Sequence, residues 1–222
     1  MARMASHVLH ALGRVNDRHP WSHNDAYSSW IVRHARHVHK RGGLRALDVG
    51  CGTGNLVKRL SRELTDVRGI EPDPVSADAA HTLTRELGNV VISQSTWAEL
   101  RNTQYDFITF VAVLHHLPLQ ETLRTARLLL APGGRLVIVG VARETARDTP
   151  LSLISLLLNP LIGLALHPTA AARPPAHMRS PVRAPTDTFA EIAAVAKREL
   201  PGVTLRRRLF WRYTAVWTAS SH

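Results

Sequence analysis

Short apolar runs alternate with segments of helical spacing through the first two thirds of the chain. Apolar residues recur at helical spacing in residues 27–41, 55–64, 74–87 and 119–130. The short apolar runs occupy residues 44–50, 67–71, 89–93, 105–113 and 135–141. Strands that alternate with helices in this way predict a parallel sheet with helices on both faces.

A different pattern begins after residue 142. Residues 167–187 hold five prolines, which favour a loop. Thr188 is followed three residues later by a glutamate, and this capping-box spacing predicts a helix over 189–200. Two β-rich runs within 203–220 meet in a tight turn near Trp211, so we expect a hairpin on the sheet edge. The predicted fold is α/β, with a doubly wound, mostly parallel seven-stranded sheet that ends in a C-terminal antiparallel hairpin.

Length and composition are those of one domain, or of one domain with an appendage. Of the 222 residues 45% are hydrophobic, which excludes a disordered chain. We divide the chain into an N-terminal helical cap (1–43), a ligand-binding core (44–142) and a further part of the same domain (143–222). The single cysteine, Cys51, excludes a disulfide framework and a cysteine-based zinc cluster. Nothing near the N-terminus is typical of a signal peptide, so the predicted compartment is the cytoplasm.

The formal net charge of +11 belongs to the two ends of the chain. Residues 1–45 hold eight Lys or Arg against two acids, and residues 143–222 hold eleven against five. The functional interpretation is an anionic partner, such as nucleic acid, a lipid headgroup or an acidic substrate. The alternative is a solvated, Arg-rich surface.

The strongest motif is the segment DVGCGTG, residues 48–54, where a predicted strand turns into a helix. Glycine at alternate positions lets the backbone turn sharply and approach a ligand closely. Asn55 disrupts the dinucleotide spacing G-x-G-x-x-G, and the Gly-Lys-Ser/Thr of a phosphate loop is missing. The carboxylate of Asp48 would repel a pyrophosphate but attract a cationic amino-acid group. Glu71 follows Gly50 by 21 residues, the spacing of an acid that binds a ribose diol, so a nucleoside carrying an amino acid is the predicted ligand.

Four motifs in residues 44–141 resemble those of the class I S-adenosylmethionine-dependent methyltransferases. LDVGCGTGNL is similar to the first motif, and Glu71 in GIEPD matches the ribose-binding acid. YDFITFVAVLHHL resembles the fourth-strand motif, and LLLAPGGRLVIV the fifth-strand motif. The resemblance is to the small-molecule type, as in the group that serves ubiquinone and menaquinone biosynthesis. It implies a Rossmann-like fold, S-adenosyl-L-methionine as cofactor and an acceptor-side insertion within 143–222.

The same resemblance implies roles for individual residues at the strand ends. It implies that Glu71 holds the ribose, that Pro72 packs near the adenine, and that Val111 and Ala112 end the fourth strand beside the methyl donor. The residues expected to contact the adenine after the third strand are Thr96 and Trp97, where many relatives carry an acid. The cofactor-binding residues expected from the glycine turn are Asp48, Gly50, Cys51, Gly52 and Gly54.

Histidines supply the candidates for acid–base chemistry. His115 and His116 follow the fourth strand, and either could take a proton from the acceptor near neutral pH. His115 is the first choice, because in similar enzymes the next residue more often turns toward the scaffold. The alternative is that one of them caps a helix. No metal site is expected, because the histidines at 34, 37 and 39 lack an acidic or cysteine companion.

Two further segments carry open alternatives. The first contains Trp21, His23, Asn24 and Tyr27, and it is either a lid over the cofactor or acceptor or an aromatic helix entry. The second, 151–166, is uncharged and rich in leucine, and we expect it to form one or two short helices.

Several properties of the segment 151–166 leave its partner open. It is too short to span a bilayer, and Pro160 interrupts it. Its leucines could line an apolar acceptor pocket, pack as ordinary core, or contact a membrane surface with help from Arg147 and Arg173. Its serines, asparagine and glycine share one helical face, and they are Ser152, Ser155, Asn159 and Gly163.

The leading hypothesis is an S-adenosylmethionine-dependent methyltransferase that acts on a small, apolar or aromatic acceptor. The basic flanks favour an RNA methyltransferase as the alternative. A protein that binds S-adenosylmethionine without transferring its methyl group is the third. The sequence does not determine the oligomeric state.

Overall fold

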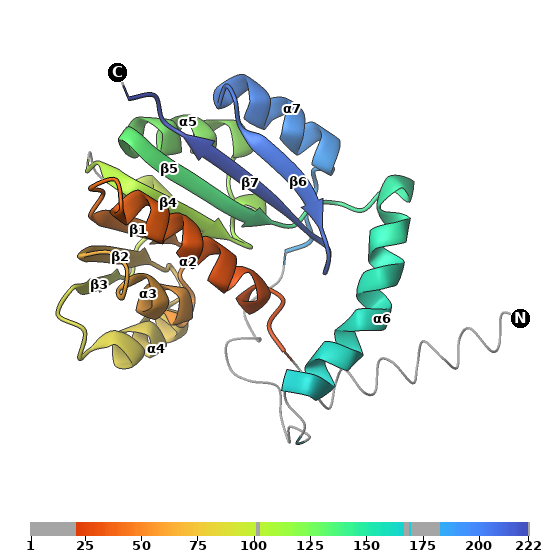
Figure 1. Ribbon diagram of the computed structural model, residues 1–222, viewed down its shortest axis with the longest axis horizontal. Helices are drawn as coiled ribbons and strands as arrows, with labels where there is room; N and C mark the ends of the chain where they lie inside the picture. Colours follow the sequence, from red (N-terminus) through yellow and green to blue (C-terminus); the bar gives the residue numbers. More distant parts are fainter. Residues whose placement is uncertain (1–20, 101–102, 167–168, 170–182, 222) are drawn as a thin grey trace, which may run out of the picture.

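The computed structural model describes residues 21–100, 103–166, 169 and 183–221, and Figure 1 labels the elements. The strands are β1 (Arg45–Val49), β2 (Asp66–Ile70), β3 (Val90–Ser93), β4 (Tyr105–Val111), β5 (Leu130–Gly140), β6 (Thr204–Arg208) and β7 (Arg212–Thr218). The α-helices are α2 (Asp25–His39), α3 (Asn55–Leu60), α4 (Pro74–Thr84), α5 (Leu119–Leu129), α6 (Thr149–Leu166) and α7 (Phe189–Glu199). Short 3-10 helices are η1 (Trp97–Glu99), η2 (Leu114–His116) and η3 (Ala146–Asp148).

The seven strands form one sheet in the order β3-β2-β1-β4-β5-β7-β6. Strands β1 to β5 pair in parallel, whereas β7 runs antiparallel to both β5 and β6. The structure thus confirms the predicted mostly parallel sheet with a C-terminal hairpin on its edge. Because the order reverses direction beside β1, the carboxyl ends of β1 and β4 flank a topological switch point, where ligands of such sheets bind.

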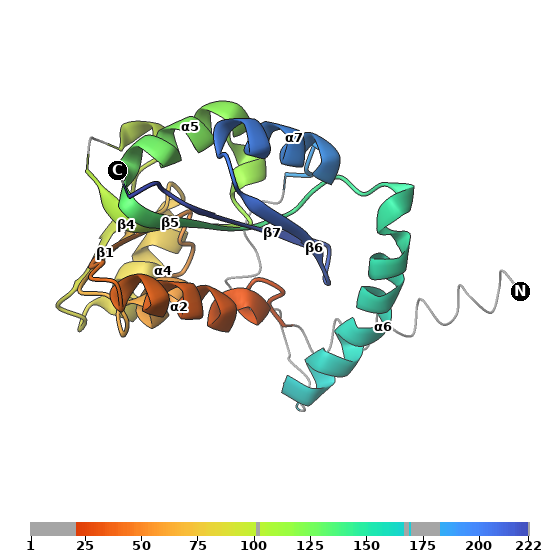
Figure 2. The same ribbon diagram turned by 45° about the horizontal axis from the view of Figure 1, so that its top comes forward.

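Helices cover both faces of the sheet. Figure 2 shows α5 and α7 on one side and α2 and α4 on the other. Each face has its own buried cluster, and β4 contributes to both: Phe107 packs with residues of α2 and α3, whereas Ile108 and Phe110 pack with residues of α5 and α7. A strand buried on both faces explains the continuous apolar run that predicted it.

Several element boundaries differ from the sequence prediction. The helix expected over 55–64 ends at Leu60 and continues as a turn. The strand expected over 105–113 ends at Val111, because Ala112 adopts a left-handed φ of 56° that no strand accommodates. The last parallel strand begins earlier than expected, since Leu130 already pairs with Tyr105 ahead of a register shift.

The leucine-rich segment differs most from its prediction. It forms one continuous helix of 18 residues with Pro160 inside it, rather than one or two short helices interrupted at the proline. Proline removes one hydrogen bond of a helix and can kink it without ending it. Figure 1 shows α6 bent along its length and standing apart from the sheet. The expectation of ordinary core is wrong, because five of its large apolar side chains are exposed.

Some sequence predictions lie outside the described residues. They concern residues 1–20 of the predicted cap and 170–182 of the predicted proline-rich loop, including Arg173. The helix expected after this loop is present as α7, and its capping box joins Thr188 and Glu191 as the spacing predicted.

Candidate functional site

A cavity of about 1290 Å³ lies at the carboxyl ends of the parallel strands. Its first half, here called the donor end, is lined by residues 48–53 after β1, 71–73 after β2, 95–97 after β3 and 111–113 after β4. Its second half, here called the acceptor end, is lined by residues 21–24, 115–117, 141–144, 183–185 and 211–212. The strands β2, β1, β4, β5 and β7 lie side by side in the sheet in this order. The groups of residues at their ends therefore follow one another along one edge of the sheet.

The glycine turn is held open by backbone geometry that other residues rarely adopt. Gly50 and Gly52 have φ values of 66° and 53°. A Cβ atom on Gly50 would lie 2.3 Å from Cγ2 of Val113, whereas one on Gly52 would meet nothing within 4 Å. The amide of Gly50 donates to the carbonyl of Ile70 over 2.8 Å, which ties the turn to β2. The turn therefore leaves open space at its middle glycine, where a ligand can approach the backbone.

Gly54 serves the scaffold rather than the cavity. It is the N-cap of α3 with a φ of 82°, and it is not among the residues that line the cavity. A Cβ atom there would lie 3.0 Å from that of Ala80. Its predicted position in the ligand site therefore does not match the structure, because the helix α4 approaches it from the other side.

Glu71 is fixed at the end of β2 by two backbone amides. Its Oε2 accepts from the amide of Gly52 over 2.9 Å, and its Oε1 accepts from the amide of Asp73 over 3.0 Å. Each carboxylate oxygen has a further lone pair. The carboxylate therefore sits in a fixed orientation with capacity for two more hydrogen bonds, which suits a vicinal diol.

Asp48 is a buried acid without a basic partner among the described residues, and its relative exposure is 2%. Its Oδ1 accepts a hydrogen bond of 2.6 Å from the hydroxyl of Thr109. Burial raises the pKa of Asp48 to about 7, and nearby Glu71 adds to the rise, although the Thr109 bond opposes it. A cationic group placed beside these two acids would relieve their repulsion. Burial, with the same two acids nearby, raises the pKa of the neighbouring Cys51 thiol, which disfavours its thiolate form at neutral pH.

The edge beyond β3 is shaped by η1. Thr96 caps η1, and its hydroxyl donates to Oε2 of Glu99 over 3.0 Å. The indole of Trp97 packs edge-on against Phe110 with ring centroids 5.1 Å apart. Thr96 and Trp97 line the cavity as predicted, together with Pro72 of the β2 end. The loop after β3 does contain an acid, Glu99, three residues beyond Thr96. Its carboxylate accepts hydrogen bonds from the amide and the hydroxyl of Thr96 and so holds η1 in place.

The two predicted histidines lie after β4, where the backbone is strained. Ala112 has φ 56°, and its amide donates to the carbonyl of Val139 over 2.7 Å. The imidazole rings of His115 and His116 are 3.9 Å apart. His115 is half-buried and its Nδ1 has no hydrogen-bond partner among the described residues, whereas His116 is exposed. Burial, with the charges of His116 and Arg212 nearby, lowers the pKa of His115 to about 4.

The N-terminal segment is joined to α6 across 138 residues of sequence. The Trp21 indole Nε1 donates to Oδ1 of Asn159 over 2.8 Å, and Nε2 of His23 lies 2.7 Å from the same oxygen. Both rings also pack against Phe210, with centroids 4.9 Å and 5.5 Å away. In both Figure 1 and Figure 2 this segment lies beside the C-terminal half of α6. Three of the predicted lid residues, Trp21, His23 and Asn24, therefore line the cavity. Tyr27 does not line it, and its hydroxyl donates to the carbonyl of Leu209 over 2.8 Å.

The hairpin turn completes the acceptor end. Phe210 and Trp211 both have left-handed φ values, 58° and 56°, although neither is glycine. Such strain in bulky residues is kept only where the surroundings impose it, and it is concentrated at functional sites. Arg212 follows, and its guanidinium donates to Oδ1 of Asn24 over 3.0 Å and to the carbonyl of Phe210 over 3.3 Å. It makes no ion pair with another described residue.

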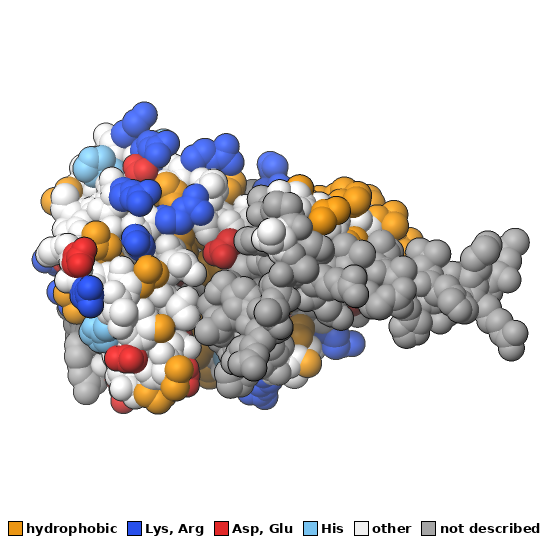
Figure 3. Space-filling view, turned by 90° about the horizontal axis from the view of Figure 1, so that it is seen from below, with side chains coloured by type: hydrophobic (Ala, Val, Ile, Leu, Met, Phe, Trp, Pro, Cys, Tyr) orange, Lys and Arg blue, Asp and Glu red, His pale blue; other side chains and the backbone are white. Residues whose placement is uncertain are grey.

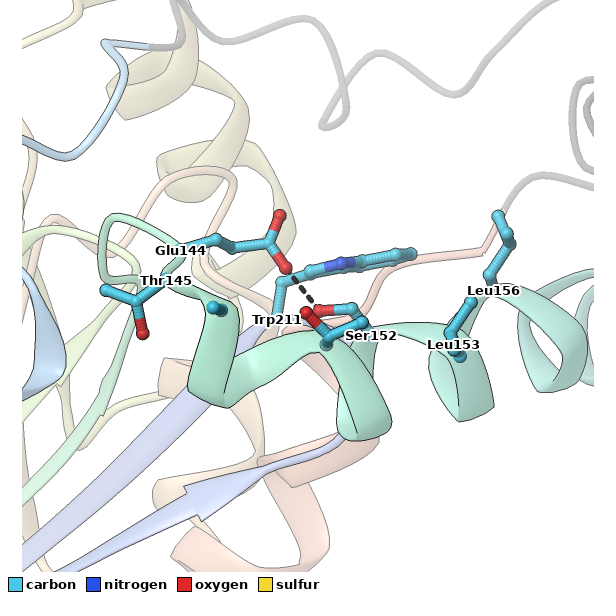
Figure 4. A pocket seen from close by; sticks show the side chains of 8 residues that line it. Glu144, Thr145, Ser152, Leu153, Leu156 and Trp211 are labelled. Atoms are coloured by element: carbon cyan, nitrogen blue, oxygen red, sulfur yellow. Dashed lines mark hydrogen bonds between the residues drawn. The ribbon is translucent and has the colours of Figure 1, made fainter.

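A smaller pocket of about 420 Å³ adjoins the acceptor end. Figure 4 shows the Trp211 ring above the first turns of α6 and Glu144 directed at Ser152. The Ser152 hydroxyl donates to this carboxylate. Leu153 and Leu156 line the same pocket, so part of α6 faces a recess beside the main cavity.

Nearly all the predicted site residues meet in the main cavity. They are Asp48, Gly50, Cys51, Gly52, Glu71, Pro72, Thr96, Trp97, Val111, Ala112, His115 and His116. The cavity-lining residues that the sequence motifs did not identify include Arg143, Glu144, Arg183, Trp211 and Arg212. The sequence contained one weak signal for these residues, which was the high number of arginines in the C-terminal part of the chain.

The residues present fit S-adenosylmethionine. Gly52 offers a backbone approach without a side chain, and Glu71 offers two acceptor positions for a ribose diol. Asp48 offers a buried negative charge for a cationic ligand. Trp97 and Pro72 border the side where an adenine ring would lie.

Comparison with known proteins agrees with this arrangement. A family model described as "Methyltransferase domain" matches residues 9–178. An uncharacterized methyltransferase of Mycobacterium tuberculosis (strain ATCC 25618 / H37Rv) is 30% identical over 205 residues, which are 90% of this chain and 98% of that protein. The ubiquinone biosynthesis O-methyltransferase of Aeromonas salmonicida (strain A449) is 34% identical over 113 residues, 47% of this chain and 48% of that enzyme.

Solved structures share the fold at lower identity. The magnesium protoporphyrin IX methyltransferase from Synechocystis PCC 6803 with bound SAH (S-adenosylhomocysteine) has a TM-score of 0.56 at 19% identity. This match covers 87% of the present chain and 83% of that structure. The N-methyltransferase NodS from Bradyrhizobium japonicum WM9 has a TM-score of 0.53 at 14% identity, with coverage of 88% and 97%.

Proposed function

The chain belongs to the class I S-adenosylmethionine-dependent methyltransferases, and we propose that it methylates a small, aromatic or apolar acceptor that carries an acidic group. The observation that carries this proposal is the division of charge in the cavity. Asp48, Glu71 and Asp73 line the donor end, whereas Arg143, Arg183 and Arg212 line the acceptor end with two carboxylates, Glu144 and the Asp25 that follows Asn24.

The donor end suits the cofactor through groups that are already fixed. S-adenosylmethionine, when bound, supplies an activated methyl group on a sulfonium, so the protein mainly provides proximity and alignment. Glu71 would hold the ribose, and Asp48 would face the cationic amino-acid part. The rigid turn at Gly50 and Gly52 would keep both in register, because its amides are tied to β2.

The acceptor end favours a flat, acidic molecule. Trp21 and Trp211 offer indole surfaces for an aromatic or apolar body. The guanidinium of Arg212 contacts only neutral oxygens, and a half-buried charge of this kind is stabilised by an anionic ligand. An acceptor that carries a carboxylate or phenolate would therefore be favoured at this end of the cavity.

His115 is the candidate base. Its low pKa keeps the imidazole neutral at pH 7, and its buried Nδ1 has no hydrogen-bond partner in the described part of the chain. A neutral imidazole accepts the hydrogen bond of an acceptor hydroxyl and takes its proton as the new bond to the methyl group forms. A negative group bound at Arg212 would raise the pKa of His115 toward neutrality.

The function is tested with the full chain and methyl-labelled S-adenosylmethionine. Aromatic acids and phenols are each paired with a neutral amide or ether of the same shape. We expect labelling of the acids and not of the neutral partners. Labelling of the neutral partners alone would contradict the acidic-group assignment, and preferential labelling of RNA would favour the RNA methyltransferase.

Cofactor binding is tested separately by calorimetry on Glu71→Ala. Loss of hydrogen bonds to a charged group costs about 1.5–3 kcal/mol, so binding should weaken by roughly tenfold or more. Glu63→Ala is the matched control, since Glu63 pairs with Arg36 away from the cavity. Unchanged affinity in a folded Glu71 variant would reject the donor site. Intact cofactor binding with no transfer to any acceptor would favour a non-catalytic binding protein.

A further inference from the structure

The helix α6 presents its apolar side chains to solvent and its polar side chains to the protein. Its exposed large residues have relative exposures of 45–61%, and they are Leu153, Ile154, Leu157, Leu161 and Leu164. At about 100° per residue these five lie within roughly a quarter of the helix circumference. They make up five of the nine exposed large hydrophobic residues in the described parts of the chain. We call this surface the outer leucine face.

The opposite side of α6 is fastened by hydrogen bonds. Ser155 is fully buried, and its hydroxyl accepts from the amide of Phe210 over 2.7 Å. Asn159 is 7% exposed and binds Trp21 and His23. Turning the helix over would break these bonds and leave buried polar groups unsatisfied. The outer leucine face is therefore held outward by the fold.

We propose that the chain docks on an anionic membrane surface through the outer leucine face, with α6 lying in the plane of the interface. A helix with an exposed aliphatic face and neighbouring arginines is typical of this mode of binding. The inference does not depend on methyl transfer, since it concerns a surface outside the donor end.

Charge favours an anionic membrane over a second copy of the chain. Two copies, each with a formal charge of +11, repel one another, whereas acidic headgroups attract them. Arg147 lies in η3, which leads directly into α6, and it is exposed and makes no ion pair with another described residue. Nearby acids are partly neutralised, because Asp148 pairs with Arg207. Figure 3 shows hydrophobic side chains gathered over α6 in the right half of the molecule, with Lys and Arg side chains along the same edge.

The attachment of α6 favours an in-plane position over a membrane crossing. Residues 146–165 are the one stretch of the described chain with the length and composition to cross a membrane, so the expectation that this leucine-rich segment is too short to span a bilayer is wrong. A crossing helix would have to leave Phe210, Trp21 and His23, which form the wall of the acceptor end. An in-plane helix keeps these bonds and buries only the leucines.

The test is flotation of the full-length protein with vesicles of phosphatidylcholine, with and without phosphatidylglycerol. We expect the wild type to bind the anionic vesicles. The double variant Leu157→Asn/Leu161→Asn should bind them roughly tenfold or more weakly. Leu128→Asn is the matched control, because Leu128 is 73% exposed on α5, and it should bind like the wild type. All three proteins should share one melting temperature, since these side chains are exposed.

Three results would overturn the proposal. The first is a wild type that does not bind anionic vesicles. The second is a double variant that binds as tightly as the wild type, which would assign binding to the arginines alone. The third is a leucine-dependent dimer in sedimentation velocity without lipid, which would assign the face to a second copy.

Discussion

The donor end and the acceptor end of the cavity differ in how far apart in sequence their contacts lie. Glu71 binds the amides of Gly52 and Asp73, which are 19 and 2 residues away. At the acceptor end, Trp21 binds Asn159 across 138 residues and Arg212 binds Asn24 across 188. The donor end is therefore built from consecutive strand-end turns, whereas the acceptor end depends on three distant segments docking together.

This difference in contact range separates the part of the cavity that binds the cofactor from the part that selects the acceptor. Rigid turns place the same groups whatever acceptor is used, because the sheet fixes the turn positions. Loops and appended helices vary more readily than the elements they connect, and they carry specificity. We expect changes at the donor end to act on cofactor affinity and changes at the acceptor end to act on acceptor use.

The largest effect is expected from Gly50→Ala. The new Cβ atom would overlap Val113 at 2.3 Å, and a left-handed φ of 66° costs a non-glycine residue about 1–2 kcal/mol. Cofactor affinity should fall on the order of a hundredfold, measured by calorimetry on the folded variant. Gly42→Ala is the control, because Gly42 has φ 90° but no atom within 4 Å of a new Cβ. Equal losses in both variants would show that backbone strain, and not the turn, is responsible.

Arg212→Gln should produce the next largest effect, on the other half of the cavity. Loss of a charged hydrogen bond to an acidic acceptor costs about 1.5–3 kcal/mol, so KM for the acceptor should rise roughly tenfold to a hundredfold. Cofactor affinity should stay unchanged. Arg206→Gln, on the exposed edge strand β6, is the matched control. A parallel loss of cofactor affinity would place Arg212 at the donor end and contradict the division of the cavity.

The sequence predicted the donor end well for a physical reason. Each of its groups follows a strand whose apolar run is legible, and Glu71 lies at a fixed distance from the glycine turn. The acceptor end was only partly predictable: Trp21 and His23 were candidates, but Arg212 was not. Nothing local in the sequence tells that Phe210 and Trp211 adopt left-handed backbones, because these conformations follow from contacts with α6 and the N-terminal segment. The sequence analysis also failed to predict that α6 continues through Pro160, because the contacts that hold this helix are likewise distant in sequence.

The pH dependence of cofactor binding tests the donor end without a substitution. Burial raises the pKa of Asp48 from its usual 3.8 to about 7. The folded protein therefore keeps this proton between about pH 4 and 7 while the unfolded chain loses it, so this group's contribution to stability falls as pH rises through that window. Binding of a cationic ligand favours the ionised form. Affinity for S-adenosylmethionine should thus rise up to tenfold per pH unit toward pH 7 and then level off.

Calorimetry at several pH values checks the role of Asp48. Asp48→Asn should flatten the profile below pH 7, because the amide does not titrate. A profile that keeps its slope in this variant would assign the proton to a group other than Asp48.

The smallest effect is expected from Ser155→Ala, which acts on the joint between α6 and the hairpin. The variant removes the acceptor of the Phe210 amide and leaves that buried donor unsatisfied, at a cost of about 1–3 kcal/mol. For a chain of this size each kcal/mol corresponds to roughly 2–4 °C in Tm, so calorimetric unfolding should show a fall of a few degrees. Because the same bond holds the strained turn beside Arg212, KM for the acceptor should rise a few fold while cofactor affinity stays constant. Ser152→Ala is the control for stability one turn away, since its hydroxyl donates to the carboxylate of the exposed Glu144. If the Ser155 variant lost cofactor affinity in proportion to its stability, the two ends of the cavity would form one cooperative unit, and the independence argued from their different contact ranges would be wrong.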